Sequence, residues 1–236
     1  MTPWETYQQD LKRDDFKHDP AQENAVRELQ RLYEELVSQP ATTAGFASKL
    51  KAFLGARSTS APVQGIYFYG GVGRGKTYLV DTFYHCLPFD NKMRVHFHRF
   101  MHRVHDELKL LGGKQDPLDI IAAKLAKETR IICFDEFFVS DITDAMILGK
   151  LMEALFSHGI VLVATSNIVP DELYRNGLQR ARFLPAIALI NKHCNVVNVD
   201  SGVDYRLRTL EQAEIYHYPL DEQATSNLHG YFTQLA

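Results

Sequence analysis

Residues 65–77 read GIYFYGGVGRGKT and constrain the fold of this chain more than any other stretch. Their apolar start is typical of a buried strand, and a helix is expected to begin near residue 75. Gly70 and the triplet Gly75-Lys76-Thr77 are four residues apart, which matches the pattern G-x-x-x-x-G-K-[ST]. Glycines let the backbone curl so that successive N–H groups point at an anion, and a helix N-terminus adds unpaired donors. The strand before the loop and the helix after it favour a phosphate cradle over a chance glycine-rich turn.

The side chains of this loop predict a site for ATP with Mg²⁺. A lysine at position 76 can reach the β- and γ-phosphates, and the hydroxyl of Thr77 can ligate Mg²⁺. We expect nucleotide contacts from the whole loop, namely from Gly70, Gly71, Val72, Gly73, Arg74, Gly75, Lys76, Thr77 and Tyr78.

A second apolar run ends in two carboxylates. Residues 130–137 read RIICFDEF, so a buried strand stops at Asp135 and Glu136, as in a Walker B motif. Asp135 is predicted to hold Mg²⁺ through water, and Glu136 to act as general base toward the attacking water. Alternatively, the strand ends in solvated acids, but the phosphate cradle about 60 residues earlier favours the catalytic interpretation.

Residues 159–167 read GIVLVATSN and predict a further strand with a polar end. Asn167 is our candidate for a residue between Glu136 and the γ-phosphate that orients the water. It could instead cap the helix expected at Pro170-Asp171.

Two arginines further along are candidates for an arginine finger that completes a neighbouring subunit's site. The planar fork of arginine suits a γ-phosphate better than the point charge of lysine. Arg180 is the first choice and Arg182 the second, and a surface salt bridge is the alternative for each.

The wider pattern alternates strands with helices, which indicates an α/β fold: a parallel sheet with helices on both faces and the ligand at the carboxyl ends of the strands. The expected strands are 65–70, 94–98, 130–135, 159–165 and 195–200, and the expected helices are 75–86, 99–111, 117–128, 142–157 and 181–192. We expect three parts: a helical segment over 1–62, a core over 63–210, and a further region over 211–236 that ends in a helix from Asp221.

The segment over 1–62 is expected to contain three apolar-spaced helical stretches and a linker. The first includes Trp4, Tyr7 and Leu11, the second begins with Asp19 as N-cap and Pro20 at the first helical position, the third runs from Phe46 to Leu54, and the linker covers 55–62.

Composition and charge are those of an ordinary soluble globular chain. The 236 residues carry a net charge of −3, which does not favour nucleic acid or a membrane surface as partner. No signal peptide or membrane-length apolar run is visible. The three cysteines, Cys86, Cys133 and Cys194, sit in apolar contexts and are expected to be reduced core residues of a cytoplasmic protein.

Five stretches together resemble one family. They read GIYFYGGVGRGKT, VHFHRFMHRVH, IICFDEFFVSDITDAMIL, VLVATSNIVPDELYRNGLQR and VDYRLR, in this order, and the likeness covers most of residues 1–210. The chain resembles the ZapE family of bacterial cell-division AAA+ ATPases, which is similar to the mitochondrial Afg-type ATPases.

The resemblance implies a P-loop NTPase AAA+ core with a five-stranded sheet of order 5-1-4-3-2, ATP hydrolysis and ATP-dependent self-association. It implies a protein client like the division-ring protein FtsZ, action at the division septum, and a position for Gln22 near the adenine. Family members continue past residue 236 into a helical lid, so the resemblance implies that residues 211–236 are the start of an incomplete lid region and that this chain is a truncated form.

Two weaker patterns have open interpretations. His96, His98, His102 and His105 form H-x-H-x₃-H-x₂-H, with the first pair on one face of a strand and the second on one face of a helix. Convergence of these faces would make a metal site, but no cysteine or carboxylate spacing supports one. Phe100-Met101 fits either the apolar grip of a pore loop or a core-facing pair on a helix.

Three function classes compete. A protein-directed AAA+ ATPase accounts for most features; a nucleic-acid-directed AAA+ loader is the alternative, although no basic helix-turn-helix or arm is visible. A small-molecule kinase would carry a lid with several arginines and lack an asparagine after the Walker B strand. The stretch Asn191-Lys192-His193-Cys194 lacks the carboxylate that reads guanine, which excludes a GTPase.

Overall fold

The structure, a computed structural model, describes residues 1–14, 16–38, 63–200 and 225–226. The stretch 46–54, the linker 55–62, the VDYRLR stretch and the helix expected from Asp221 therefore lie outside the described residues, apart from 225–226. In chain order the helices and strands are α1 Pro3–Asp10, α2 Pro20–Ser38, β1 Gly65–Tyr69, α4 Lys76–Cys86, β2 Lys92–His96, α5 Phe97–Leu110, α6 Pro117–Glu128, β3 Ile131–Asp135, α7 Ile142–Ser157, β4 Val161–Ser166, α8 Leu184–His193 and β5 Cys194–Asn198. Short 3₁₀ turns lie at Pro170–Glu172 and Arg180–Arg182.

The five strands form one parallel sheet in the order β2-β3-β4-β1-β5. This is the predicted order 5-1-4-3-2. Strand β1 lies between β4 and β5, and β3 lies between β2 and β4, so the carboxyl ends of β1, β3 and β4 meet at one edge. A ligand is expected at this edge, where the direction of winding changes.

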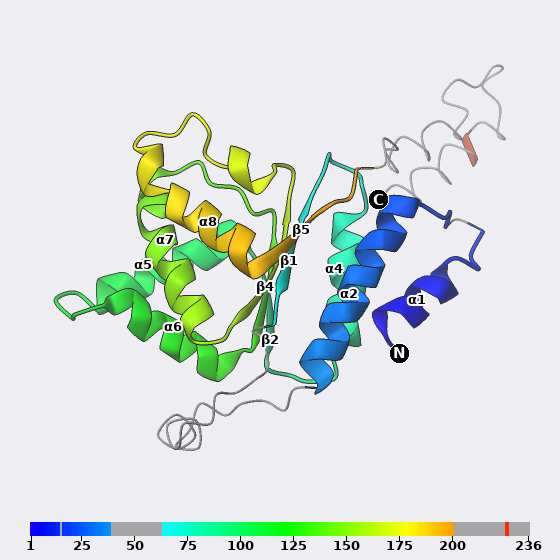
Figure 1. The fold of residues 1–236 in the computed structure, drawn as a ribbon, viewed down its shortest axis with the longest axis horizontal. Helices are drawn as coiled ribbons and strands as arrows, with labels where there is room; N and C mark the ends of the chain where they lie inside the picture. Colours follow the sequence, from blue (N-terminus) through cyan, green and yellow to red (C-terminus); the bar gives the residue numbers. More distant parts are fainter. Residues whose placement is uncertain (15, 39–62, 201–224, 227–236) are drawn as a thin grey trace.

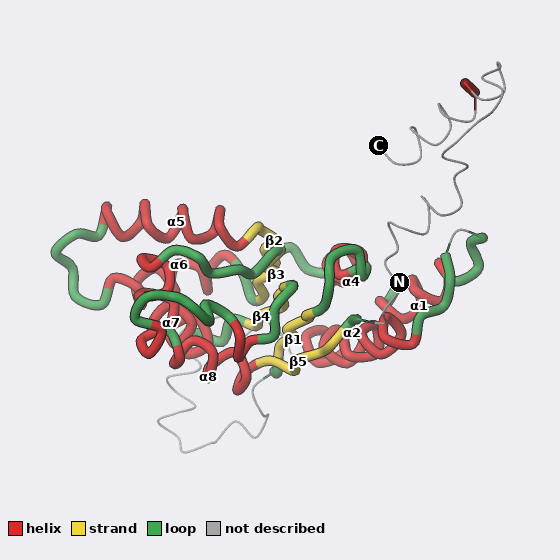
Figure 2. Tube along the Cα trace, turned by 90° about the horizontal axis from the view of Figure 1, so that it is seen from above, coloured by secondary structure: helices red, strands yellow, loops and turns green. Residues whose placement is uncertain are grey.

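Helices cover both faces of the sheet (Figure 1). Helices α1, α2 and α4 lie on one face and α5 to α8 on the other, and the view from above agrees (Figure 2). Alternate residues of β1 serve the two faces: Ile66 and Phe68 pack with the α2 and α4 side, and Tyr67 packs with the α5 to α8 side. All three are fully buried, as expected for a strand covered on both faces.

The N-terminal helices begin as the sequence predicts. Oδ1 of Asp19 accepts a hydrogen bond from the backbone N–H of Ala21 at 2.7 Å, and Pro20 occupies the first helical position of α2. The buried stripe of α2 includes Leu29 and Leu32. Within the described residues, no helix has the length and hydropathy that crossing a membrane requires.

The second strand and the helix after it are shifted from the expected positions. We expected a strand over 94–98 and a helix over 99–111, whereas β2 is Lys92–His96 and α5 begins at Phe97. The alternation in VHFHRF imitates the period of a strand. The buried residues Phe97, Phe100, Met101 and Val104 follow the period of a helix instead, and packing against the sheet selects that period.

The helix expected over 181–192 also begins later. A 3₁₀ turn covers Arg180–Arg182, and α8 begins at Leu184 with Pro185 in its first turn. Proline is tolerated in the first turn of a helix but not in its interior, where its missing N–H removes a hydrogen bond, so a helix that began at residue 181 is disfavoured. The helices expected over 75–86, 117–128 and 142–157 are confirmed as α4, α6 and α7 to within one residue.

Candidate functional site

The loop between β1 and α4 forms a backbone cradle that depends on glycine. Gly73 and Gly75 have φ values of 76° and 75°, in the left-handed region, and Gly75 is the N-cap of α4. A Cβ atom on Gly75 would lie 2.4 Å from Nε2 of Gln22. The left-handed conformation at this position favours glycine, and a larger residue would have to displace the Gln22 amide. The first turn of α4 follows this loop directly, and N–H groups at a helix N-terminus have no partner within the helix, which suits an anion.

Lys76 connects the glycine loop to the end of β4. Its Nζ donates hydrogen bonds to the carbonyl oxygens of Gly70 and Gly71, each at 2.7 Å, and to Oδ1 of Asn167 at 2.8 Å. The predicted cation and the predicted water-orienting amide are therefore in direct contact, although they are 91 residues apart in the chain.

Glu136 sits at the end of β3 in an unusual backbone conformation. Its φ is 55°, and its backbone N–H donates to Oγ1 of Thr165 at 3.2 Å. Ser166 fixes the following residue, because its Oγ donates to the carbonyl oxygen of Phe137 at 2.8 Å. A non-glycine residue in the left-handed region is a strained feature that commonly marks a functional site.

These residues line one cavity of about 690 Å³. Its described lining residues come from the glycine loop, the end of β3 and the end of β4: Val72, Gly73, Arg74, Gly75, Lys76, Thr77, Glu136, Phe137, Phe138, Thr165, Ser166, Asn167 and Ile168. Of the predicted site residues, Lys76, Thr77, Glu136 and Asn167 are thus brought together. Asp135 is absent from the described lining.

Asp135 is instead engaged by an arginine that the sequence analysis missed. Arg94 of β2 donates to it twice, from Nε to Oδ2 at 2.8 Å and from Nη2 to Oδ1 at 3.3 Å. The same guanidinium also pairs with Asp81 of α4 through Nη1. A basic residue in the middle of β2, the strand next to β3, was the available signal.

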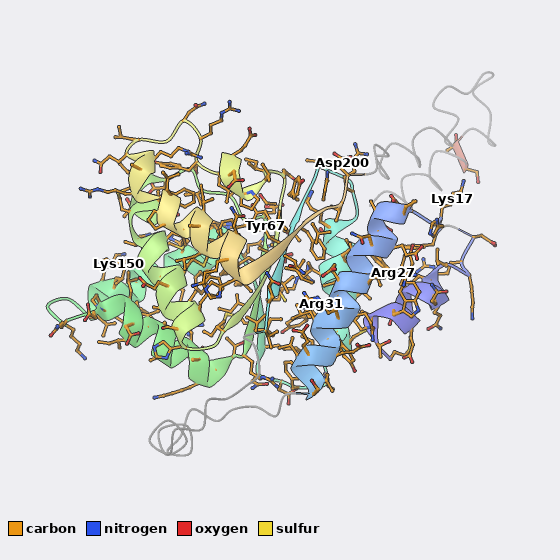
Figure 3. The ribbon with its side chains drawn as sticks, in the orientation of Figure 1. Lys17, Arg27, Arg31, Tyr67, Lys150 and Asp200 are labelled. Atoms are coloured by element: carbon orange, nitrogen blue, oxygen red, sulfur yellow. The ribbon has the colours of Figure 1, made fainter. Side chains whose placement is uncertain are left out.

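A second missed residue, Asp200, holds the glycine loop from the end of β5. Its Oδ1 lies 2.9 Å from Nε of Arg74, and its Oδ2 accepts from the backbone N–H of Gly71 at 3.3 Å. Figure 3 shows Asp200 at the end of the sheet, beside the loop that leads from β1 into α4. Arg74, predicted to contact nucleotide, is thus positioned by an ion pair across the loop.

Gln22 and Tyr78 lie against the glycine loop from the side of the N-terminal helices. Gln22 is 3% exposed, its amide faces Gly75, and its Oε1 has no hydrogen-bond partner. The hydroxyl of Tyr78 donates to Asp10 at 2.6 Å, and its ring packs on Phe16. Burial, with the Asp10 carboxylate beside it, raises the pKa of Tyr78. The side chain of Tyr78 therefore faces α1 rather than the cavity.

The two arginines considered as fingers lie outside the cavity. Nη2 of Arg180 donates to the carbonyl oxygen of Asp171 at 2.6 Å, and Asn191 bonds the carboxylate of the same residue at 2.9 Å. Arg182 is exposed and lines a separate groove between α6, α7 and α8. Neither arginine belongs to the described lining of the cavity of its own chain.

The histidine pattern is distributed differently from the expectation. His96 ends β2, whereas His98 is in α5, so the prediction that both share a strand face is wrong. Nε2 of His105 lies 2.6 Å from Oδ1 of Asp144. In the part of the chain that the structure describes, no three side chains of metal-ligating type come together. Phe100 and Met101 are each 1% exposed, which places this pair in the core and excludes an apolar grip at the surface.

The residues present fit a nucleotide with a divalent cation. The cradle has positive-φ glycines where a side chain would intrude, Lys76 is aimed into it, and Thr77 and Asp135 offer the oxygen ligands that Mg²⁺ prefers. The parallel sheet of this order, with a glycine loop between β1 and its helix, defines a P-loop NTPase with the AAA+ core.

Comparison with known proteins gives the family. The model of the AFG1-like ATPases matches residues 1–236, so the chain belongs to the AFG1-like ATPase family. It is 54% identical over 241 residues to the cell division protein ZapE of Escherichia coli K12, an alignment that includes 100% of this chain and 64% of that protein. The chain thus spans less than two thirds of the length of this relative.

Solved structures of low sequence identity share the fold. DnaI is similar with a TM-score of 0.52 at 15% identity, over 77% of this chain and 86% of DnaI. AMPPCP-bound DnaA from Aquifex aeolicus is similar with a TM-score of 0.53 at 12% identity, over 93% of this chain and 62% of DnaA. At these identities the likeness concerns the fold alone.

Proposed function

We propose that this chain binds ATP with Mg²⁺ and hydrolyses it, as an AAA+ ATPase that acts on a protein client. The observation that carries the proposal is the contact between Lys76 and Asn167 across a cavity that Glu136 also lines. A cation for the phosphates, an amide for the water and a carboxylate for its proton are the three groups that hydrolysis of a phosphoanhydride needs.

Each residue has a distinct task in this proposal. The N–H groups of the glycine loop and Nζ of Lys76 bind the β- and γ-phosphates, and Lys76 exchanges its present carbonyl partners for phosphate oxygens. Thr77 and Asp135 would hold Mg²⁺, which supplies positive charge to neutralise the phosphate oxygens. Gln22, whose Oε1 has no hydrogen-bond partner, would contact the adenine side of the nucleotide.

Glu136 and Asn167 act on the attacking water. The amide of Asn167 orients the water, and the Glu136 carboxylate accepts its proton as the oxygen attacks the γ-phosphorus, so that ADP and inorganic phosphate are the products. The backbone N–H of Glu136 donates to Thr165, which fixes the main chain that carries this carboxylate.

The client belongs to the proposal by similarity. The E. coli relative is named as a cell division protein, and we propose a division-ring protein of the FtsZ type as client, with ATP-dependent self-association and action at the division site from the cytoplasm. The nucleic-acid-directed alternative has less support, because several exposed arginines of the described chain, such as Arg27 and Arg103, are paired with glutamates.

A series of three variants tests the proposed chemistry. Lys76→Ala should lose tight ATP binding, because the main cation facing the phosphates is removed; calorimetry measures this. Glu136→Gln should bind ATP and hydrolyse it more slowly by about 10²–10⁴-fold, the usual contribution of a general base. Asn167→Ala should be impaired more mildly, because it orients water without taking a proton.

The matched controls are Lys109→Ala and Glu153→Gln, two exposed residues remote from the cavity. Unchanged ATP affinity in Lys76→Ala would contradict the nucleotide site, and unchanged phosphate release in Glu136→Gln would place the base elsewhere. Binding to DNA that weakens steeply with salt would favour the loader alternative.

A further inference from the structure

Arg94 is held between two carboxylates that come from different elements. It makes a two-point contact with Asp135 at the end of β3 and a further contact with Asp81 on α4. The side chains of Arg94 and Asp135 are 20% and 14% exposed, and that of Asp81 is 43% exposed. The ion pair at Asp135 is therefore partly desolvated, and the one at Asp81 opens to solvent.

The sheet register explains this arrangement. Arg94 lies opposite Cys133 on β3, and Asp135 is two residues further along the same strand. Residues two apart in a strand point to the same face, so Arg94 and Asp135 share the face that α4 covers. Helix α4 begins at the glycine loop, and Asp81 lies about one turn after Thr77. Arg94 thus links the predicted Mg²⁺ ligand Asp135 to α4, through a residue one turn after the other predicted ligand, Thr77.

The Asp135 oxygens that would serve Mg²⁺ are the oxygens that Arg94 occupies. A cation at this position must share them with the guanidinium or displace it, and the positive charge of Arg94 beside the site opposes the ion. Displacing an arginine from its only carboxylate would leave a partly buried charge unpaired, which is costly. Asp81 removes this cost, because Arg94 keeps an ionic partner when it releases Asp135.

We propose that Arg94 is a positioning residue that sets the Mg²⁺ affinity of the site through Asp135, and that Asp81 is the counter-charge that allows Arg94 to release it. This inference rests on the proposed function, since it concerns the cation of the same nucleotide site. It predicts opposite effects on metal affinity for the two substitutions. Removing the Arg94 charge should raise the affinity, and removing the Asp81 charge should lower it, because Arg94 then binds Asp135 more strongly.

The experiment measures the metal directly. Mn²⁺ binding in the presence of ATP is followed by electron paramagnetic resonance, and Mg²⁺ is titrated against binding of a fluorescent ATP analogue. Arg94→Gln should lower the metal concentration at half-saturation by about tenfold, the order expected when a unit charge beside a partly screened ion is removed. Asp81→Asn should raise it by roughly threefold or more on the same grounds.

The double variant separates the proposed route from a general field effect. If Asp81 acts through Arg94, adding Asp81→Asn to Arg94→Gln should leave the half-saturation value of Arg94→Gln unchanged. A further loss of affinity in the double variant would mean that Asp81 acts on the ion by itself, which would overturn its proposed role. Asp81 is on the surface of α4, so Asp81→Asn carries the test even if Arg94→Gln does not fold.

Arg103→Gln is the matched control, because Arg103 also bridges two carboxylates, those of Glu107 and Glu128, away from the cavity. It should change unfolding temperature at most, not metal affinity. Metal affinities equal to wild type in both Arg94→Gln and Asp81→Asn would overturn the inference and leave the proposed function intact. Absence of metal-nucleotide binding by the wild-type chain would instead contradict the proposed function itself.

Discussion

At the scale of single residues, the phosphate cradle depends on backbone conformations that only a few residues tolerate. Gly75 has a positive φ, and its missing Cβ leaves room for the amide of Gln22. Gly113 also has a positive φ, of 82°, but no atom lies within 4 Å of the position of its Cβ. Both glycines therefore have a left-handed backbone conformation, but only Gly75 has another side chain close to the position of its missing Cβ.

This pair gives a residue-scale prediction. Gly75→Ala and Gly113→Ala should each lower the free energy of unfolding by about 1–2 kcal/mol, the cost of a left-handed conformation for an L-residue. Only Gly75→Ala should also weaken ATP binding, because the new methyl group displaces Gln22 and distorts the cradle. Thermal unfolding and calorimetry measure the two effects. Equal ATP affinities in the two variants would contradict the importance of the close approach.

The sequence indicated candidate site residues that follow a local pattern and missed residues that are defined by distant partners. Lys76, Glu136 and Asn167 were predicted because each follows a recognisable strand, and all three line one cavity. Arg94 was missed because its partners are 13 and 41 residues away and its meaning depends on strand register. Asp200 was missed for the same reason, since its partner Gly71 is 129 residues away.

At the scale of helices and strands, periodicity decided most of the predictions. The strands β1, β3 and β4 were predicted because apolar runs buried on both faces are distinctive. The predicted boundary between β2 and α5 was wrong because the short stretch VHFHRF fits the period of a strand as well as that of a helix. Burial of Phe97 and Phe100 against the sheet selects the helix. The start of α8 was wrong because one proline outweighs the propensity of the residues before it.

The buried strands lead to a prediction about thiols. Cys133 of β3 and Cys194 of β5 are buried, and burial raises the pKa of each thiol to about 12. Cys86 at the end of α4 is only half-buried, so the expectation of three core cysteines holds for two of them. Thiolate is the reactive form, so at pH 8 a thiol reagent should modify Cys86 in the folded chain and all three cysteines after unfolding.

The same shift gives the sign of a pH effect. Below about pH 8 the two buried thiols are protonated in both the folded and the unfolded state, so they add no pH dependence to the free energy of unfolding. As the pH rises from about 8 toward 12, the thiols of the unfolded chain ionise first, so the free energy of unfolding should fall. For the labelling experiment, Cys86→Ser is the control, because it removes the accessible thiol. Rapid modification of Cys133 or Cys194 in the folded chain would contradict their burial.

At the scale of the whole molecule, the parallel sheet with helices on both faces was predictable from the alternation of strands and helices, and the order of the strands from the family resemblance. The contacts between neighbouring subunits were not predictable, because the sequence shows an arginine without showing which subunit's site it enters. Arg180 and Arg182 both lie outside the cavity of their own chain. A role in ATP hydrolysis therefore requires a neighbouring subunit.

The structure gives each arginine a reason to be considered. Arg180 is pre-oriented by its hydrogen bond to the Asp171 carbonyl oxygen, and its Nε has no hydrogen-bond partner. Arg182 is exposed on the groove between α6, α7 and α8. We keep Arg180 as the proposed finger, because a guanidinium held by one bond loses less freedom when it engages a phosphate.

Arg180→Ala should then leave ATP binding nearly intact. It should reduce the rate of hydrolysis by about 10³-fold or more, which is the contribution of arginine fingers supplied in trans. Arg182→Ala is the control and should matter less. Mixing Arg180→Ala with Lys76→Ala should restore part of the activity, because some neighbouring pairs then combine an intact glycine loop with an intact finger. Phosphate release per chain, followed across the concentration range in which ATP-dependent assembly appears by sedimentation, measures this. Wild-type turnover in Arg180→Ala, or activity per chain that is independent of concentration, would show that hydrolysis is completed within one subunit and that Arg180 only anchors the turn before α8.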